Sequence, residues 1–297
     1  MKEIKLRNFW PQNDTTKKFL VNLIEDCRPD SMNVALTSVF PETSLTRKGI
    51  EALKVRRGIK LALKVQQRRL YNLLDPLEDE KYLNIWYTGE NLRPPSETKW
   101  DALLTFEEDN DAAKNIYLPF WATTLGETIE EAEEVQKILL LPRNGEGPKN
   151  SFACAVIGNP EPMRMRMIKE LENLGKVNLF GSVFNNPVKD KKTVLQKHTF
   201  NVCFENDLYP GYVTEKAIDA WLAGAIPIWW GLDKFNYLNP KAIINIAQLG
   251  FDGGIKIIDE IAANILRISS IQSEPILQKG YDYKLLKSKL TNYLQNK

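Results

Sequence analysis

The sequence predicts an α/β protein with parallel strands. Short apolar runs alternate with longer segments whose apolar residues recur at helical spacing, a pattern typical of strands connected by helices. Residues 142–150 are dense in turn formers, have no periodicity, and interrupt this alternation near the middle of the chain. The length of 297 residues exceeds what one typical core requires. We therefore expect two α/β halves joined by a linker.

The expected elements follow the two periodicities along the chain. Strands are expected where short runs rich in β-branched and aromatic residues occur, at residues 4–9, 33–37, 82–87, 102–106, 152–157, 199–204, 226–230 and 242–246. Helices are expected where apolar residues take helical spacing, at residues 15–27, 46–73, 128–141, 162–174, 214–223 and 259–269. Leu286, Leu290 and Tyr293 predict one further, closing helix. The predicted domains are residues 1–145 and 146–275, with the closing helix in 276–297.

Composition narrows the class of protein. With 43% hydrophobic and 26% charged residues, the chain is typical of an ordinary globular protein and not of a disordered or fibrous one. A net charge of +2 and the lack of a recognisable motif argue against nucleic-acid binding. Three widely spaced cysteines and a single histidine argue against disulfides and against a metal site.

Two further features concern location. Residues 1–6 lack the apolar core of a secretion signal, and no run reaches the roughly 18 apolar residues of a membrane span, so we expect a cytoplasmic protein. Residues 47–69 carry nine Lys and Arg residues against one Glu. This basic segment is interpreted first as a long helix with a solvated face, because its apolar residues need a core. The alternative is peripheral contact with a lipid-linked acceptor at the inner face of the membrane.

Two separated blocks carry a family resemblance. The longer block is residues 204–216, Phe-Glu-Asn-Asp-Leu-Tyr-Pro-Gly-Tyr-Val-Thr-Glu-Lys. Residues 195–203, Leu-Gln-Lys-His-Thr-Phe-Asn-Val-Cys, lead into it, and residues 226–231, Ile-Pro-Ile-Trp-Trp-Gly, follow. The shorter one, residues 87–94, is Tyr-Thr-Gly-Glu-Asn-Leu-Arg-Pro. Together they resemble the α1,3/4-fucosyltransferases of the bacterial type. Asp207 stands where serine is common in that family, and Pro210 enters the variable part of its loop.

This resemblance implies a GT-B fold, in which two Rossmann-like domains face each other across a cleft. It also implies GDP-fucose as the donor. In that family the donor is held by residues that correspond here to Arg164, Asn206, Tyr212, Glu215 and Lys216.

The chemistry of these residue types agrees with such a donor site. A leaving diphosphate gains negative charge, which cations must stabilise where no metal does so. Lys216 supplies a compact charge, and the planar guanidinium of Arg164 can hold two phosphate oxygens. Glu215 can accept hydrogen bonds from both ribose hydroxyls. By resemblance, Asn206 and Tyr212 contact the fucose and the phosphates. Taken alone, Lys216 and Glu215 are also compatible with ordinary first-turn helix residues.

A general base is expected in the N-terminal half. Glu90 follows a predicted strand, where functional residues gather in open α/β sheets, and by resemblance it is the catalytic base. A surface carboxylate is the alternative interpretation. His198, the single histidine, is placed poorly for this role. One base and one displacement invert the configuration at the sugar carbon, so a β-linked donor yields an α-fucoside.

Other motifs are interpreted as structural. Residues 109–111, Asp-Asn-Asp, look like a metal-binding motif, but their acidic turn predicts a solvated loop. Trp221, Trp229 and Trp230 alternate with aliphatic residues and are expected to pack. Arg166 is expected to face solvent.

The predicted function is transfer of fucose from GDP-fucose to a hydroxyl of an oligosaccharide or lipid-linked glycan, at O3 of GlcNAc or glucose. No cofactor is expected to be required, although Mn²⁺ or Mg²⁺ can stimulate such a reaction without being essential. Two alternatives remain open: a transferase of the same fold that uses another GDP-sugar, and a GDP-sugar-binding protein without transfer activity. If the protein does not distinguish GDP-fucose from GDP-mannose, a transferase for another GDP-sugar is favoured. If no acceptor leads to release of GDP, a binding protein without transfer activity is favoured.

Overall fold

The computed structural model describes residues 2–9, 14–39, 76–94 and 99–295. The chain divides into an N-terminal unit, Met1–Ala132 with Asp282–Lys297, and a C-terminal unit, Glu133–Tyr281. The division falls within helix α4 (Ile129–Leu139), ahead of the turn-rich residues 142–150, and the closing helix groups with the N-terminal unit. Each unit contains a five-stranded parallel sheet, so the predicted α/β class is confirmed.

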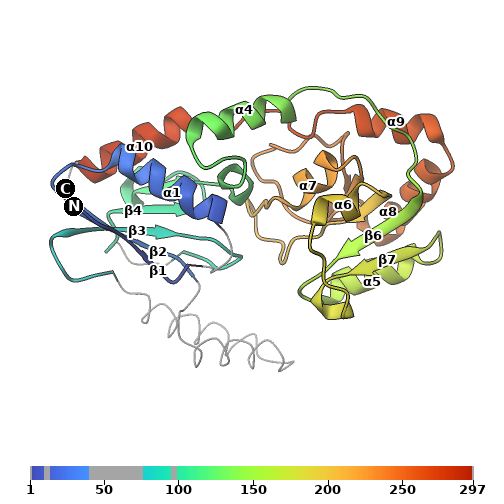
Figure 1. Ribbon diagram of the computed structural model, residues 1–297, viewed down its shortest axis with the longest axis horizontal. Helices are drawn as coiled ribbons and strands as arrows, with labels where there is room; N and C mark the ends of the chain where they lie inside the picture. Colours follow the sequence, from blue (N-terminus) through green and yellow to red (C-terminus); the bar gives the residue numbers. More distant parts are fainter. Residues whose placement is uncertain (1, 10–13, 40–75, 95–98, 296–297) are drawn as a thin grey trace. The chain divides into compact units, whose positions relative to one another are not determined.

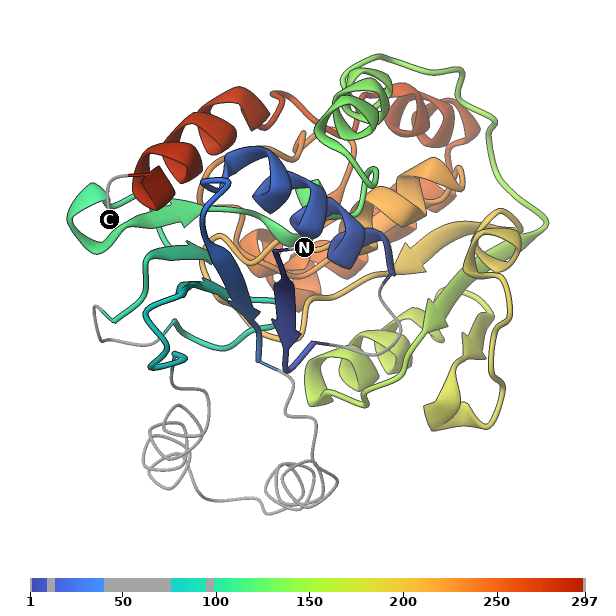
Figure 2. The ribbon, with the colours of Figure 1, turned by 60° about the vertical axis from the view of Figure 1, so that its left-hand side comes forward.

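The N-terminal unit is built on a sheet whose strand order, β1-β2-β3-β4-β5, follows the sequence. Helices α1 and α10 pack against each other on one face of this sheet (Figures 1 and 2). The elements are β1 (Ile4–Arg7), α1 (Asp14–Cys27), β2 (Asn33–Thr37), β3 (Tyr82–Tyr87), β4 (Ala102–Thr105), η1 (Asp111–Ala113), β5 (Asn115–Tyr117), η2 (Phe120–Thr123) and α10 (Tyr283–Gln295).

The central strands of this sheet are buried on both faces. Leu36 of β2 lies opposite Ile85 of β3 on one face, and Thr37 lies opposite Trp86 on the other. All four side chains are fully buried. Because a parallel sheet is covered on both faces, its strands read as continuous apolar runs, which explains why β2 and β3 have their predicted limits.

The C-terminal helix is tied to the loop between β4 and β5. Lys289 forms ion pairs with Asp109 (3.0 Å) and Asp111 (3.1 Å), and the Tyr293 hydroxyl donates to Asp111. Asp109 also accepts a hydrogen bond from the backbone N–H of Tyr117 (2.7 Å). As predicted, the acidic turn is an exposed loop, and its carboxylates in addition anchor α10.

The C-terminal unit has the strand order β7-β6-β8-β9-β10, all parallel. The first strand of the unit, β6, lies between the second and the third, so the strand order reverses between β6 and β8. Helices cover both faces of this sheet. Its elements are β6 (Ser151–Val156), α5 (Pro162–Leu171), β7 (Val177–Phe180), η3 (Ser182–Phe184), α6 (Lys191–Leu195), β8 (His198–Val202), α7 (Lys216–Leu222), β9 (Ile226–Trp229), β10 (Ile244–Asn245), α8 (Ile246–Ala262) and α9 (Ile265–Ser273).

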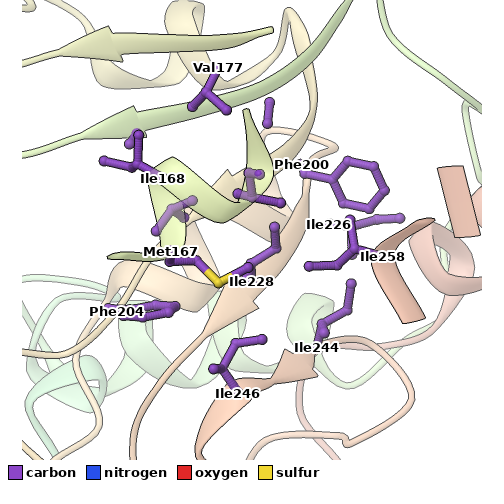
Figure 3. Close-up of a cluster of buried hydrophobic side chains, with 14 of the residues drawn as sticks. Met167, Ile168, Val177, Phe200, Phe204, Ile226, Ile228, Ile244, Ile246 and Ile258 are labelled. Carbon is purple, nitrogen blue, oxygen red and sulfur yellow. The ribbon is translucent and has the colours of Figure 1, made fainter. Parts of the chain in front are cut away.

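One large apolar cluster forms the core of this unit (Figure 3). Met167 and Ile168 of α5 pack there with Ile258 of α8 over the side chains of Phe200 and Ile228. On the opposite face Cys154 packs with Leu195, the last residue of α6, and with Ala223, the C-cap of α7. The sheet is therefore doubly wound, the arrangement in which ligands bind beyond the carboxyl ends of the strands where the order reverses.

Several predicted elements differ from the structure. The helix predicted at residues 259–269 is wrong, because α8 ends at Ala262 and α9 starts at Ile265, with Asn264 capping the second helix through its side chain (3.1 Å to Arg267 N). The short elements β5, β7 and α6 were not predicted. The predicted helix at 46–73 and the basic segment 47–69 lie outside the described residues. Among the helices that the structure describes, none has the length and apolar character needed to cross a bilayer.

The anchor on α10 makes stability depend on pH. Hydrogen bonds from Tyr293 and then Lys289 hold the pKa of Asp111 below its ordinary value of about 3.9. A carboxyl whose pKa is lower in the folded state stabilises the fold above its unfolded pKa, and this contribution is lost as the pH falls through the lowered value. We expect Asp111→Asn to lower the free energy of unfolding in urea at pH 7, with the deficit shrinking as the pH falls below about 4. Asp30→Asn, at an exposed turn, is the control; a deficit independent of pH would contradict this assignment.

Candidate functional site

Arg164 lies at the point where the strand order of the C-terminal unit reverses, between the ends of β6 and β8. This residue lies in the first turn of α5, which Pro162 opens directly after the loop that follows β6. Its guanidinium donates to the carbonyl of Asn159 (3.0 Å), the carbonyl of Phe204 (2.7 Å) and Oδ1 of Asn206 (2.6 Å). Arg164 thus joins the loops that follow the neighbouring strands β6 and β8, and only 6% of its surface is exposed.

Asn206 and Tyr212 extend this hydrogen-bonded chain. Because arginine only donates, the bond from Arg164 fixes which end of the Asn206 amide is the oxygen. The amide nitrogen of Asn206 then lies 3.5 Å from the hydroxyl of Tyr212, which is buried. The chain turns tightly at Gly211: Tyr212 N–H donates to the carbonyl of Tyr209 (2.9 Å), and Gly211 has φ of 85°. Pro210 before a glycine with positive φ is typical of a type II turn, which explains the proline in this loop.

A buried carboxylate that the sequence analysis missed organises the next segment. Glu205, 1% exposed, accepts hydrogen bonds from Thr214 N (2.9 Å), Thr214 Oγ1 (2.7 Å), Trp229 Nε1 (3.2 Å) and Lys216 Nζ (3.0 Å). Lys216 Nζ also donates to Thr214 Oγ1 (2.8 Å). Burial of a charge is costly unless it is paired and hydrogen-bonded, and here both conditions are met. The sequence feature that could have indicated this role is the position of Glu205 directly after the apolar Phe204, near the end of a predicted strand.

Glu215 and Lys216 stand at the start of α7, which is two residues shorter at its N-terminus than predicted. Burial by itself raises the pKa of the Glu215 carboxyl, but the positive charges of Lys216 and Lys191 hold that pKa below its ordinary value. Lys191 of α6 also pairs with Asp219 of α7, at 2.7 Å. Glu215 is therefore ionised at neutral pH and lies among charged groups from two helices. No local pattern in the sequence marks Lys191 or Asp219 for this cluster.

The candidate base, Glu90, belongs to the N-terminal unit. It is half-buried in the bend that follows β3, and its carbonyl accepts from Leu92 N (2.6 Å). The strand direction continues past β3 because Thr88 N–H donates to the carbonyl of Leu104 (2.9 Å), while the Thr88 hydroxyl accepts from Trp86 Nε1 (2.9 Å). The backbone before Glu90 is thus fixed at the carboxyl end of the sheet, as the sequence predicted.

Several other flagged residues have structural roles. The His198 ring is buried; its Nδ1 donates to the carbonyl of Val194 (2.8 Å), and its Nε2 accepts from Asn178 Nδ2 (2.9 Å), so the tautomer is set by its partners. Burial lowers the pKa of His198. Arg166 is exposed, as predicted, and its guanidinium lies over the ring of Phe251, 4.1 Å from the ring centre. Trp229 is buried.

Gly181 fixes the loop after β7. Its φ is 109°, and a Cβ at this position would lie 2.1 Å from the carbonyl oxygen of Ile157. Only glycine allows this loop to approach the end of β6 so closely. Over residues 2–9, 14–39, 76–94 and 99–295, no group of three or more His, Cys, Asp or Glu side chains is placed to hold a metal ion.

The residues of this unit also match a known family. Residues 147–252 correspond to the C-terminal part of glycosyltransferase family 10, the fucosyltransferases. The resemblance inferred from the motifs is confirmed. The matched range includes all five predicted donor-binding residues and Glu205, whereas Glu90 lies outside it.

Individual relatives agree with this match. Over 203 residues, the chain is 29% identical to the α-(1,3)-fucosyltransferase FucT of Helicobacter pylori, covering 58% of this chain and 42% of that protein. It is 34% identical over 95 residues to 4-galactosyl-N-acetylglucosaminide 3-α-L-fucosyltransferase 9 of Mus musculus, covering 31% of this chain and 26% of the relative. The chain thus spans less than half the length of these curated relatives.

Crystal structures of α1,3-fucosyltransferase have the same fold. One matches 99% of this chain and 89% of its own with a TM-score of 0.65 at 22% identity. Another, determined with GDP-fucose, has a TM-score of 0.64 at 20% identity. At this level of identity the match establishes the fold, which is of the GT-B type.

The Glu205 network predicts a large effect from one buried substitution. Glu205→Gln removes the charge opposite Lys216 and replaces one acceptor oxygen with an amide NH2, a donor that then faces Lys216 Nζ or Trp229 Nε1, which only donate. Breaking a buried pair in this way is strongly destabilising, so we expect the free energy of unfolding in urea to fall by about 3 kcal/mol. Glu134→Gln, which breaks the exposed pair with Lys137, should cost less than about 1 kcal/mol. Equal stability of the two variants would show that Glu205 does not organise this segment.

Proposed function

We propose that the protein transfers fucose from GDP-fucose to a hydroxyl group of a glycan, forming an α1,3 linkage. This proposal depends most on the hydrogen bond from Arg164 to Asn206, because the pair places a cation and an amide where the strand order reverses. That position is the usual ligand site of doubly wound sheets. The match of residues 147–252 to the fucosyltransferases, and the GDP-fucose bound in one neighbouring structure, support the choice of ligand.

Arg164 and Lys216 are proposed to hold the diphosphate. Three protein acceptors fix the plane of the Arg164 guanidinium, so its orientation is set before a ligand arrives. Lys216 is held in turn by Glu205 and Thr214. Preorganised donors of this kind stabilise the charge that develops on a leaving diphosphate. We accordingly propose that the reaction does not require a metal ion, which transfer in EDTA would test.

Glu215, Asn206 and Tyr212 are proposed to hold the sugars of the donor. An ionised carboxylate accepts hydrogen bonds from the 2′- and 3′-hydroxyls of ribose, and the lowered pKa of Glu215 keeps it ionised at neutral pH. Asn206 and Tyr212 form a polar pair beside Arg164, in reach of a sugar attached to the diphosphate.

Glu90 is proposed to act as the general base. As the acceptor oxygen attacks the anomeric carbon of fucose, its proton passes to the Glu90 carboxylate. The bond from the anomeric carbon to the diphosphate oxygen breaks in the same step, and GDP leaves with the electron pair. A single displacement inverts the configuration, so GDP-β-L-fucose yields an α-fucoside. One relative is an α-(1,3)-fucosyltransferase and another is a 4-galactosyl-N-acetylglucosaminide 3-α-L-fucosyltransferase, which supports attack by O3 of a GlcNAc unit.

The acceptor is proposed only as a class of molecule. An oligosaccharide or a lipid-linked glycan with GlcNAc or glucose is the expected class of acceptor. The basic segment 47–69 lies outside the described residues, and its contact with anionic lipid on the cytoplasmic membrane face is proposed from sequence alone.

The role of Glu90 is tested by separating chemistry from binding. We expect Glu90→Gln to lower kcat for fucose transfer by about a hundredfold or more, because a general base contributes 10² to 10⁴ in rate. The dissociation constant for GDP-fucose should change by less than about twofold, since the substitution leaves the C-terminal unit intact. Transfer is followed by release of GDP, and donor affinity by calorimetry.

Two further variants complete this test. Glu108→Gln, at an exposed carboxylate after β4, should leave both quantities unchanged. Lys216→Ala should weaken donor binding and turnover together. Near-normal transfer by Glu90→Gln would exclude Glu90 as the base without bearing on the donor site.

A further inference from the structure

Helix α6 carries a lysine that is fixed on the donor side of the C-terminal unit. The helix has only five residues, and both of its ends are anchored: Asp190 caps its start by accepting from Lys192 N (3.0 Å), and His198 Nδ1 donates to the Val194 carbonyl (2.8 Å) at its end. His198 is itself held by Asn178 (2.9 Å). Helix α6, which Lys191 begins, is therefore hydrogen-bonded to β8 and, through Asn178, to β7.

From this fixed position Lys191 reaches across to α7. Its Nζ lies 2.7 Å from Oδ2 of Asp219, and the side chains of the two residues are 38% and 34% exposed. Asp219 lies one helical turn after Glu215 and donates its N–H to the Glu215 carbonyl (2.8 Å). Carboxylates four residues apart lie on the same side of a helix and repel each other. Lys191 compensates this repulsion from the neighbouring helix.

We infer that Lys191 is a positioning residue of the donor site, which ties α6 to α7 through Asp219 and places a second positive charge beside Glu215. This inference rests on the proposed role of Glu215 as the ribose acceptor. Each of the two lysines is paired with an acid: Lys191 with Asp219, one turn after Glu215, and Lys216, the residue next to Glu215, with Glu205. The lowered pKa of Glu215 agrees with this balance.

Removal of Lys191 leaves Asp219 uncompensated next to Glu215. The two carboxylates can then reduce their repulsion only by moving apart or by taking up a proton, and either change spoils Glu215 as an acceptor for two hydroxyls. The defect should be one of nucleotide binding, because ribose and diphosphate are shared by GDP and GDP-fucose.

The experiment measures GDP and GDP-fucose binding by calorimetry at pH 7, together with transfer at saturating donor. We expect Lys191→Met to weaken both ligands by about tenfold while kcat changes by less than about twofold. Lys191→Arg, which keeps the charge, should bind within about threefold of the unaltered protein. Lys192→Met removes an equal charge from the exposed neighbouring position and should have no effect.

A double variant distinguishes this role from a merely structural one. Adding Asp219→Asn to Lys191→Met removes the repulsion, so binding should recover to within about threefold. If Lys191→Met does not fold, Lys191→Gln compared with Lys191→Arg provides the same contrast between a neutral and a charged side chain.

The outcomes separate the two proposals. Unaltered GDP affinity in Lys191→Met, or no recovery in the double variant, would overturn the role of Lys191 alone. Binding of GDP without fucose transfer would overturn the proposed function and leave Lys191 in the nucleotide site. Failure of the unaltered protein to bind GDP would overturn both.

Discussion

The buried carboxylate of Glu205 is the constraint on which the C-terminal site depends. It joins the end of β8 to Trp229 of β9 and to Thr214 and Lys216 at the start of α7. A charge this deeply buried is stable only while each donor stays in place. The turn at Gly211 and the positions of Lys216 and Glu215 follow from that network, because the chain between Glu205 and Thr214 is closed by two hydrogen bonds.

Arg164 performs the equivalent function on the neighbouring strand. It binds carbonyls on both sides of the reversal in strand order, so the loops after β6 and β8 form one surface. The site therefore consists of side chains that are positioned by protein contacts before any ligand binds. Such preorganisation is what electrostatic stabilisation of a leaving group requires, because the donors then need not reorient during the reaction.

Much of the fold could be predicted because the strands are apolar throughout, as in β2 and β3, and parallel sheets require this. Short elements such as β5 and α6 were missed because too few residues carry the periodicity, and Asn264 ended a helix where the apolar pattern continues. The motif residues Arg164, Asn206 and Lys216 were found through their resemblance. Glu205, Lys191 and Asp219 were not, because their roles depend on partners distant in sequence that only the folded chain brings together.

We propose that the C-terminal unit binds GDP-fucose without a metal ion. Calorimetric titration with GDP-fucose, GDP-mannose and UDP-galactose, first in EDTA and then with Mn²⁺, would decide this. We expect GDP-fucose to bind in EDTA at least about tenfold more tightly than UDP-galactose, and more tightly than GDP-mannose. Binding without preference for the guanine nucleotide, or only in the presence of Mn²⁺, would contradict it.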